Sequence, residues 1–267
     1  MIPQFEHIHL QSVDSTNTEM KSRAADLPDY AVISAAEQTA GRGQRGNSWE
    51  AAPGENVTMS MLLRPKHIKA SEQFYISQIV ALAVASVLRG LLRRAGAAVA
   101  GHVAVKWPND IYVGDRKICG ILIENTLSGR NILHSVAGIG LNVNQRMFVS
   151  DAPNPVSLYQ LTQTVWDVDE VMNLVVGEIM ELMSLYDRED ADMDGLRRGY
   201  ADLLWRRSGL YPYVDNVRHE EIMASVQSVA PDGMLTLRLA DGSTRTYAFK
   251  EVAAILEVAA ACSCLKF

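Results

Sequence analysis

The segment from Val103 to Val143 reads VAVKWPNDIYVGDRKICGILIENTLSGRNILHSVAGIGLNV, and it decides the fold. It holds four β-like runs that are separated by turn signals. Gly114-Asp115 suits a two-residue hairpin turn, and Ser128-Gly129-Arg130 marks a second turn. Because these runs return on turns with few crossover helices, we expect a mainly antiparallel sheet and the α+β class. The four predicted strands are Val103–Lys106, Asp110–Val113, Arg116–Glu124 and Ser135–Val143.

The flanking segments add helices and further strands. Thr16 followed three residues later by Glu19 is a capping-box pattern, which predicts a helix that starts there. Apolar residues recur at helical spacing from Ser71 to Ala95, and Gly96 ends that pattern. The other predicted helices are Asp169–Tyr186 and Met193–Trp205, and the other predicted strands are Phe5–Leu10, Tyr30–Ala36 and Val57–Leu63.

The character of the sequence changes near Ser208-Gly209. Four or five short strands with tight turns follow in about 60 residues, a pattern typical of a small β-barrel. We therefore expect two domains, residues 1–207 and residues 208–267. The predicted strands of the second are Tyr211–Val217, Ile222–Val229, Met234–Leu239 and Thr244–Phe249.

The composition is that of an ordinary globular chain of 267 residues, 48% hydrophobic and 21% charged. With 25 Lys and Arg against 31 Asp and Glu, the net charge is −6. The chain as a whole is therefore no general binder of polyanions, and a phosphate or carboxylate site must be a local basic cluster. The N-terminus lacks the features of a signal peptide, and the longest apolar run, Ile79–Leu88, is far short of the ~20 residues that span a bilayer. We expect a cytoplasmic protein with no membrane partner.

Metal and covalent chemistry find little support in the residue patterns. Cys262-x-Cys264 lacks the partner residues of a zinc site, and no histidine has a metal-ligand partner at useful spacing. No serine lies in a G-x-S-x-G elbow. Cys119 lies between Ile118 and Gly120 in an apolar strand, so we expect a buried, inert thiol. The sequence thus predicts no metal site and no covalent catalysis.

A basic glycine loop, Gly41-Arg42-Gly43-Gln44-Arg45-Gly46, matches G-x-G-x-x-G literally. A dinucleotide fold needs a helix directly after the glycines and an acid about 20 residues on, but Pro53-Gly54 follows and the later position is Lys66. The Rossmann interpretation therefore fails. The glycines still allow close backbone approach, and the arginines add planar donors, so the loop could close over an anion. An ordinary basic surface loop is the alternative.

Lys106 is the second candidate for an anion site. It ends a predicted strand just before a proline, where a lysine can point into a cleft. A solvated strand-end lysine is the alternative. Glycines inside the neighbouring strands, Gly120, Gly138 and Gly140, suggest close approach of a ligand or of another backbone. Together these features favour electrostatic and positional catalysis on an anionic substrate.

Six motifs, taken in order, resemble the biotin protein ligase family. KWPND followed by K-x-x-G-I-L-x-E is the most specific part, and the similarity covers roughly residues 5–187. The C-terminal strands also resemble the SH3-like barrel of that family. The motifs are Asp14-Ser15-Thr16-Asn17, Gln38-Thr39-Ala40-Gly41-Arg42-Gly43 through Gly46 and Trp49, Lys106–Asp110, Lys117–Glu124, Gly138–Asn144 and Val156-Ser157-Leu158.

The resemblance implies a class II synthetase-like α+β domain that joins biotin and MgATP into biotinyl-5′-AMP. It then passes biotin to a lysine of the biotin carboxyl carrier protein of acetyl-CoA carboxylase. Magnesium would arrive with ATP, so no protein ligand is expected. By position, Ser15, Thr16, Asn17 and Gln38 line the biotin end, Arg42, Gly43 and Gln44 lie in the loop over biotin and phosphate, Lys106 holds the carboxylate, and Gly120, Gly138 and Gly140 let the ligand lie against the sheet. Lys106 and Arg42 are the expected catalytic residues.

Two departures from the family pattern limit what carries over. Bifunctional members have an N-terminal DNA-binding module, whereas the ligase motifs here begin by residue 14; we expect the monofunctional type and no DNA partner. Several members have arginine where this chain has Gln44, so Arg45 is a candidate to replace it. A lipoate ligase and a non-enzymatic biotin-responsive regulator are the alternative functions. We expect a monomer or a weak homodimer.

Overall fold

A seven-stranded sheet in the order β1-β2-β3-β7-β6-β5-β4 frames the computed structural model, which describes residues 4–44, 48–149 and 154–256. β1 and β2 run parallel and every other neighbouring pair runs antiparallel, as the turn signals predict. The α+β class is therefore confirmed. The strands are β1 His7–Val13, β2 Val32–Gln38, β3 Val57–Leu63, β4 Val103–Lys106, β5 Asp110–Val113, β6 Arg116–Ser128 and β7 Asn131–Leu141.

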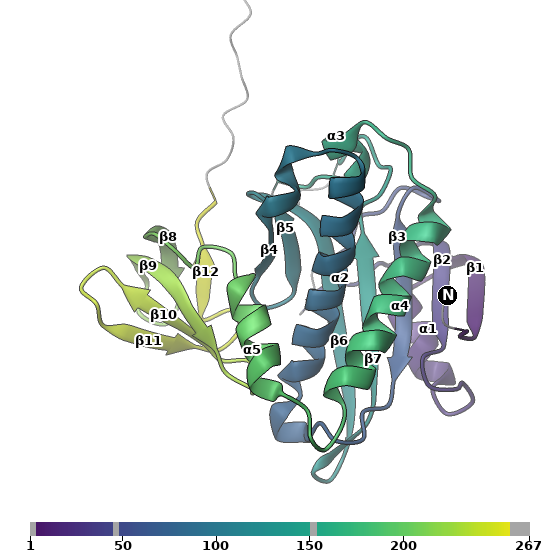
Figure 1. The fold of residues 1–267 in the computed structure, drawn as a ribbon, viewed down its shortest axis with the longest axis horizontal. Coiled ribbons are helices and arrows are strands. Elements are labelled where there is room, and N and C mark those ends of the chain that lie inside the picture. Colours follow the sequence, from purple (N-terminus) through teal and green to yellow (C-terminus); the bar gives the residue numbers. More distant parts are fainter. Residues whose placement is uncertain (1–3, 45–47, 150–153, 257–267) are drawn as a thin grey trace, which may run out of the picture.

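Two long helices cover one face of this sheet (Figure 1). They are α2, Phe74–Arg94, and α4, Val168–Tyr186, with α5, Met193–Asp202, beside them. The predicted helix from Ser71 is divided, because Ala70–Glu72 forms a separate 3₁₀ turn before α2. A short helix that the pattern did not predict, α3 Leu158–Thr162, starts at a capping box of Ser157 and Gln160.

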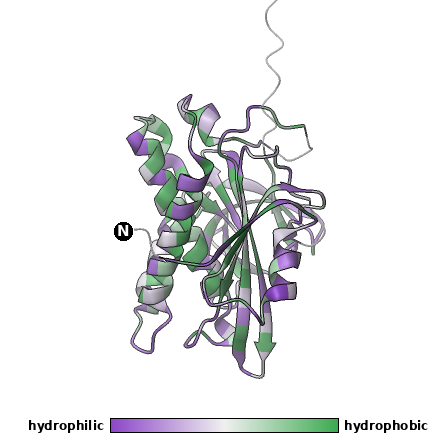
Figure 2. Cartoon of the chain, turned by 90° about the vertical axis from the view of Figure 1, so that its right-hand side faces the viewer, coloured by the Kyte–Doolittle hydropathy of each residue, from purple (hydrophilic) through white to green (hydrophobic). Residues whose placement is uncertain are grey.

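Buried apolar residues of the helices and of the strands form one large core cluster. Figure 2 colours many segments of these helices and strands green, for hydrophobic. Among the described residues, α2 is the one helix that is long and apolar enough to cross a membrane. In this fold 67% of its most apolar window is buried, and Ile76, Ile79 and Leu88 are fully enclosed. Its apolar character is accounted for by its place at the centre of the core.

The first helix, α1 Thr16–Arg23, lies behind the sheet in Figure 1 and packs on β2, β3 and β7. The predicted capping box is wrong. Ser15 is the N-cap residue and makes no side-chain capping bond, and Thr16 is already helical. The reason is that the polar side chains of Thr16 and Asn17 are buried and bonded to other strands.

A second, five-stranded antiparallel sheet in the order β11-β10-β9-β8-β12 begins at Tyr211. The order is linear, so β11 and β12 are its two edges, and a closed barrel is not confirmed. Four of its strands match the predicted segments, and the fifth is the three-residue β12. The strands are β8 Tyr211–Asp215, β9 Glu220–Val229, β10 Leu235–Leu239, β11 Thr244–Tyr247 and β12 Val252–Ala254.

The second sheet joins the first at β4 and at the start of α2. The backbone of Trp205 donates to Val105 O at 2.9 Å, and Val105 N donates to Leu203 O at 2.7 Å. The indole of Trp107 donates to Gly233 O in the β9–β10 turn at 2.9 Å. Gly233 also lies against Phe74: the nearest atom of the Phe74 ring is 3.0 Å from the position that a Cβ of residue 233 would take. The two sheets therefore meet next to Lys106.

Candidate active site

A cavity of about 580 Å³ lies between the open face of the first sheet and the second sheet. Eleven candidate residues from distant parts of the sequence line it together, as the motif analysis predicts. They are Ser15, Thr16, Asn17, Gln38, Arg42, Gly43, Gln44, Lys106, Gly120, Gly138 and Gly140. Gly41 is not part of this lining, and Arg45 and Gly46 lie outside the described residues.

One end of the cavity is a tight polar cluster at the start of α1. Gln38 Oε1 accepts from Thr16 N at 2.8 Å and lies 3.1 Å from Thr16 Oγ1. Ser60 Oγ on β3 lies 2.8 Å from Thr16 Oγ1 and 2.5 Å from Asn17 Oδ1. Thr16, Asn17 and Ser60 are almost fully buried and Gln38 is half-buried, so the hydrogen bonds of this cluster are well shielded from water and hold the side-chain orientations.

The glycines of β6 and β7 lie directly against side chains from distant segments. A Cβ at Gly138 would lie 2.1 Å from Asn17 Oδ1. A Cβ at Gly140 would lie 2.3 Å from the Trp49 indole, and one at Gly120 would lie 3.0 Å from it. Asn17 and Trp49 occupy the space directly in front of these glycines, and the close approach of a ligand to Gly120, Gly138 and Gly140 stays a prediction.

The glycine loop folds back on itself at its first residue. Trp49 N donates to Gly41 O at 3.1 Å, and Trp49 O lies 2.6 Å from the Cβ position of Gly41. A side chain at position 41 would prevent this close approach. Gln44 Oε1 and Trp49 Nε1 are shielded from solvent and have no hydrogen-bond partner among the described residues. Both atoms thus remain available to a polar ligand.

Two lysines, not one, enter the cavity. Lys106 Nζ lies 3.9 Å from Asp110 Oδ2 and 5.4 Å from the centre of the Tyr112 ring. Lys117 Nζ lies 2.7 Å from Asp110 Oδ1 and 5.5 Å from the centre of the Trp49 ring. Lys117 also passes 3.5 Å from the Cβ position of Gly120, so it is the lysine beside the glycine-lined floor.

Burial lowers the pKa of Lys106, and the nearby charges of Lys117 and Arg206 lower it further, while Asp110 opposes the shift. Among the described lining residues, four carry positive charge and one carries negative charge. The cations are Arg42, Lys106, Lys117 and Lys250, and the acid is Asp110. A local excess of positive charge inside a chain of net charge −6 fits an anionic ligand.

Metal-ligating side chains are sparse among the described residues of the cavity lining. Within the described ranges, no group of three or more His, Cys, Asp and Glu residues could hold a metal ion. The lining carboxylate, Asp110, is already paired with Lys117. Cys119 is fully buried, and burial raises the pKa of its thiol, which agrees with the expected inert cysteine.

Motif reasoning did not select Lys117 or residues of the second sheet as part of the cavity. Lys117 stands three residues before Gly120, so the K-x-x-G spacing was the available signal. Tyr213, Asn216 and Phe249 line the cavity from the second sheet and its loops, and no local pattern marks them. Their place depends on how the two sheets pack.

Comparison with known proteins gives a consistent assignment. The sequence model of the biotin/lipoate A/B protein ligase family matches residues 9–142. The chain is 34% identical to the biotin–[acetyl-CoA-carboxylase] ligase of Paracoccus denitrificans over 170 residues, 62% of this chain and 68% of that one. It is 31% identical to the bifunctional ligase/repressor BirA of Escherichia coli over 182 residues, 67% of this chain. The match spans about half, 54%, of that relative.

A solved structure shares the fold over nearly the whole chain. It is the biotin protein ligase from Aquifex aeolicus in complex with biotin and ATP, with a TM-score of 0.73 and 23% sequence identity. The superposition covers 93% of this chain and 97% of that one. At this identity the likeness concerns the fold. It extends beyond residues 9–142 and includes the second sheet.

Proposed function

The chain belongs to the biotin/lipoate A/B protein ligase family, and from this premise we propose that it activates biotin with ATP and transfers it to a carrier-protein lysine. The observation that carries the proposal is the cavity that joins a buried polar cluster to an excess of cations. Biotin has a polar ureido ring at one end and a carboxylate at the other, so it matches both parts.

In the first step, a carboxylate oxygen of biotin attacks the α-phosphorus of ATP, and pyrophosphate leaves. Both reactants are anions that repel each other. Lys106, Lys117 and Arg42 would offset this repulsion and hold the charge that develops on the phosphoryl oxygens. Magnesium would arrive with ATP, shield its phosphates and keep several waters, since Asp110, already paired with Lys117, is the one carboxylate among the described lining residues.

In the second step, a neutral lysine amine of the carrier attacks the carbonyl carbon of biotinyl-5′-AMP, and AMP leaves. The role of this chain is to keep the mixed anhydride away from water until the carrier docks. Trp49 and the residues that the second sheet contributes would enclose it. We propose the biotin carboxyl carrier protein of acetyl-CoA carboxylase as the carrier and the cytoplasm as the location.

We also propose that residues 1–207 are the catalytic domain and that residues 208–267 are an SH3-like domain. The second sheet, which starts at Tyr211 with its own strand order, supports this division. A lipoate substrate is the less favoured alternative, because its apolar dithiolane ring would offer no hydrogen-bonding group to the polar side chains of Ser15, Thr16 and Gln38 that line the cavity.

The test is transfer of labelled biotin to a carrier domain, with and without ATP, with lipoate as the competing substrate. Lys106→Ala and Lys117→Ala should each lower the rate of adenylate formation by about 100-fold or more, as expected for loss of a charge-stabilising donor. Because Lys117 lies beside the glycine-lined floor, we expect its loss to be the larger. ATP-dependent transfer of lipoate in preference to biotin would contradict the proposal. A Lys106→Ala variant with the wild-type rate would remove Lys106 from the site.

A further inference from the structure

A carboxylate outside the cavity connects to its polar end through a line of side chains. Glu124 on β6 accepts from Lys21 Nζ at 2.8 Å and from Asn17 Nδ2 at 3.0 Å. Asn17 Nδ2 also donates to Leu122 O at 3.3 Å. Glu124 does not line the cavity. Any effect of Glu124 on a ligand must therefore pass through Asn17.

Glu124 is ionised in this setting. Its burial alone would raise the pKa, but the hydrogen bonds from Lys21 and Asn17 outweigh that effect and hold the pKa of Glu124 below its usual range. An ionised carboxylate only accepts hydrogen bonds. Asn17 must therefore turn its NH₂ group to Glu124, and its oxygen, Oδ1, faces Ser60.

Ser60 passes this orientation on to Thr16. The Ser60 hydroxyl has one proton and two oxygen neighbours, Asn17 Oδ1 at 2.5 Å and Thr16 Oγ1 at 2.8 Å. Asn17 Oδ1 can only accept, so it takes the proton of Ser60. The remaining short contact is favourable only if Thr16 donates to Ser60. Ser60 is fully buried, which leaves no place for water to supply another proton.

The proton of Thr16 is thereby directed away from the cavity. Gln38 Oε1 competes weakly for the hydroxyl proton of Thr16. Gln38 Oε1 lies farther from Thr16 Oγ1 than Ser60 Oγ does, at 3.1 Å, and it already accepts from Thr16 N. Thr16 Oγ1 then offers only a lone pair to the cavity that it lines. Gln38 Oε1 is held by Thr16 N, so the Nε2 group of Gln38 is the donor at this end.

We propose that Glu124 is a positioning residue that acts through Asn17 and Ser60 to present Thr16 Oγ1 as the acceptor for a ureido N–H of biotin. The inference rests on the proposed function and deepens it. A group with an N–H donor beside a carbonyl acceptor is bound, and a ring without a donor is rejected because Thr16 Oγ1 would lose its partner.

The test measures biotin binding by calorimetry on the full chain, with ATP binding measured separately. Glu124→Gln keeps size and shape but adds an amide that can also donate, so Asn17 can turn over and the order of donors is lost. We expect biotin to bind at least tenfold more weakly and ATP to bind as before. Glu124→Asp, which stays acceptor-only, should recover part of the loss. Glu170→Gln is the matched control, since Glu170 accepts from Arg94 at 2.9 Å and does not line the cavity, and it should bind biotin within about twofold of wild type.

A double variant shows whether Glu124 and Ser60 act on biotin binding through one connected line of side chains or affect it independently of each other. Glu124 and Ser60 share no hydrogen bond, and Asn17 lies between them. If they act in one line, Glu124→Gln combined with Ser60→Ala should lose no more affinity than the more damaging single variant. Losses that multiply would overturn the inference.

The two levels of the argument fail in different ways. A wild-type chain that binds no biotin overturns the proposed function and this inference with it. A wild-type chain that binds biotin, while Glu124→Gln binds it equally well, overturns this inference alone. A parallel loss of biotin affinity, ATP affinity and thermal stability in Glu124→Gln also overturns it, since that is the signature of a merely structural residue.

Discussion

At the scale of single residues, Gly138 shows how little free space the polar end contains. A methyl group there would lie 2.1 Å from Asn17 Oδ1 and 2.8 Å from Asn17 Cγ. Asn17 cannot move aside cheaply, because Ser60, Glu124 and Leu122 O all hold its amide. The observed position of Asn17 therefore requires a glycine at position 138 of β7.

We predict that Gly138→Ala weakens biotin binding at least tenfold and lowers stability by about 1–3 kcal/mol, the usual cost of overpacking. Calorimetric titration with biotin and thermal unfolding measure the two effects. Gly90→Ala is the matched control, since Gly90 is exposed in α2 and has no atom within 4 Å of its Cβ position. That change should raise stability by about 0.5–1 kcal/mol. Equal biotin affinity in both variants would contradict the crowding at Gly138.

Sequence motifs selected residues that line one cavity because those residues lie in short, self-contained patterns. The motifs did not show which of the two lysines, Lys106 or Lys117, lies closer to the glycines of β6 and β7, since that distance depends on strand pairing. Lys117 reaches Gly120 because the register of β5 with β6 shifts between Ile111 and Tyr112, which no composition rule predicts. The partner of each glycine, Asn17 or Trp49, likewise comes from a distant segment.

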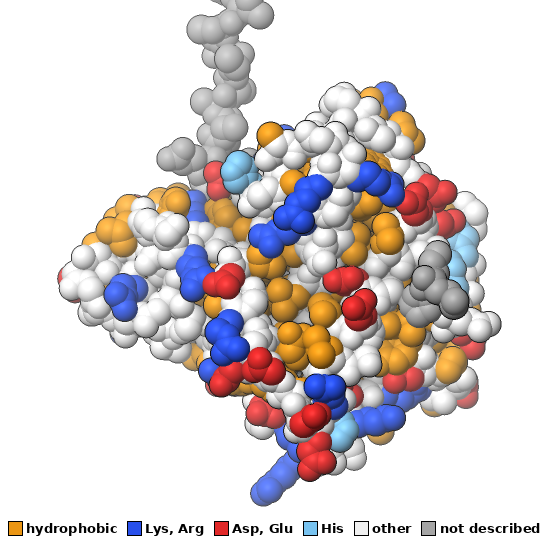
Figure 3. Space-filling model, in the orientation of Figure 1, with side chains coloured by type: hydrophobic (Ala, Val, Ile, Leu, Met, Phe, Trp, Pro, Cys, Tyr) orange, Lys and Arg blue, Asp and Glu red, His pale blue; other side chains and the backbone are white. Residues whose placement is uncertain are grey.

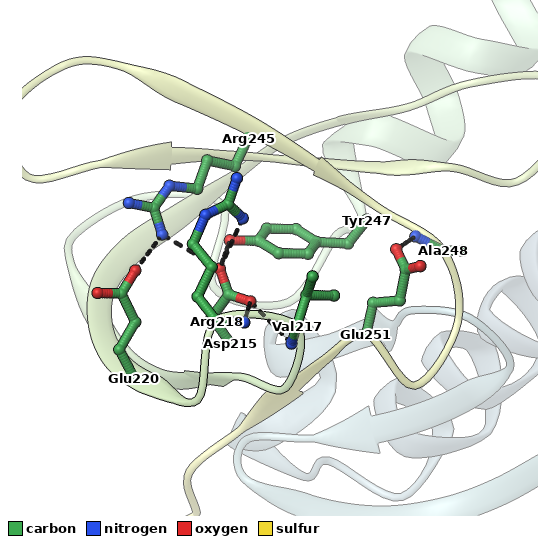
Figure 4. Close-up of polar contacts among 8 residues, drawn as sticks. All are labelled: Asp215, Val217, Arg218, Glu220, Arg245, Tyr247, Ala248 and Glu251. Carbon is green, nitrogen blue, oxygen red and sulfur yellow. Dashed lines mark hydrogen bonds and ion pairs between the residues drawn. The ribbon is translucent and has the colours of Figure 1, made fainter.

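At the scale of elements, the β8–β9 turn depends on one buried carboxylate (Figure 4). Asp215 is fully buried and accepts from Tyr247 Oη at 2.8 Å, from Arg218 and Arg245 at 3.1 Å each, and from the backbone N–H groups of Val217 and Arg218. Burial opposes ionisation of Asp215, but these hydrogen bonds outweigh it and lower its pKa to about 2. The turn is thus fastened to the edge strand β11.

We predict that Asp215→Asn lowers the free energy of unfolding near neutral pH by about 2 kcal/mol, the scale of hydrogen bonds to a charged group. Because the folded-state pKa is depressed, this stabilisation is complete above the unfolded pKa of about 3.9 and is lost as pH falls toward 2. Chemical denaturation at several pH values measures it. The gap between wild type and variant should close in acid; a constant gap would show that the charge of Asp215 is not the cause.

The elements themselves were largely predictable, and the failures have local causes. Alternation and turn glycines located β3, β4 and β5 without error. The start of α1 at Thr16 was predicted, but its capping box was not found, because the side chain of Thr16 bonds to β2 and β3 instead. The three-residue β12 is too short to show a period and exists through pairing with β8.

At the scale of the whole molecule, charged side chains of both signs are spread over the helical face of the surface, whereas the described residues that line the cavity carry an excess of positive charge. On the face drawn in Figure 3, acidic and basic side chains alternate over the helices without forming a patch of one sign. The excess of cations lies in the cavity at the junction of the two sheets. Described residues of the second sheet and its loops are therefore part of the cavity wall, because Tyr213, Phe249 and Val252 line the cavity together with Lys106.

Trp107 joins the two parts at this junction. It follows Lys106 directly, its indole N–H donates to Gly233 O at 2.9 Å, and its ring meets Phe249 at a centroid distance of 6.0 Å. Trp107 and Phe249 both line the cavity. A shift of the second sheet would therefore move a wall of the cavity beside Lys106, so this contact should affect ligand binding as well as stability.

We predict that Trp107→Phe, which keeps an aromatic ring but loses the N–H, costs about 1 kcal/mol of stability and raises the KM for ATP several-fold. Trp166→Phe is the matched control. Its indole N–H donates to Thr162 Oγ1 at 3.1 Å, and it does not line the cavity. The control should lose similar stability and leave the KM for ATP unchanged. Steady-state kinetics of adenylate formation and thermal unfolding of both variants measure the difference. If the two variants share the same KM, then the link between Trp107 and Gly233 serves stability alone, and the second sheet does not shape the ATP site through it.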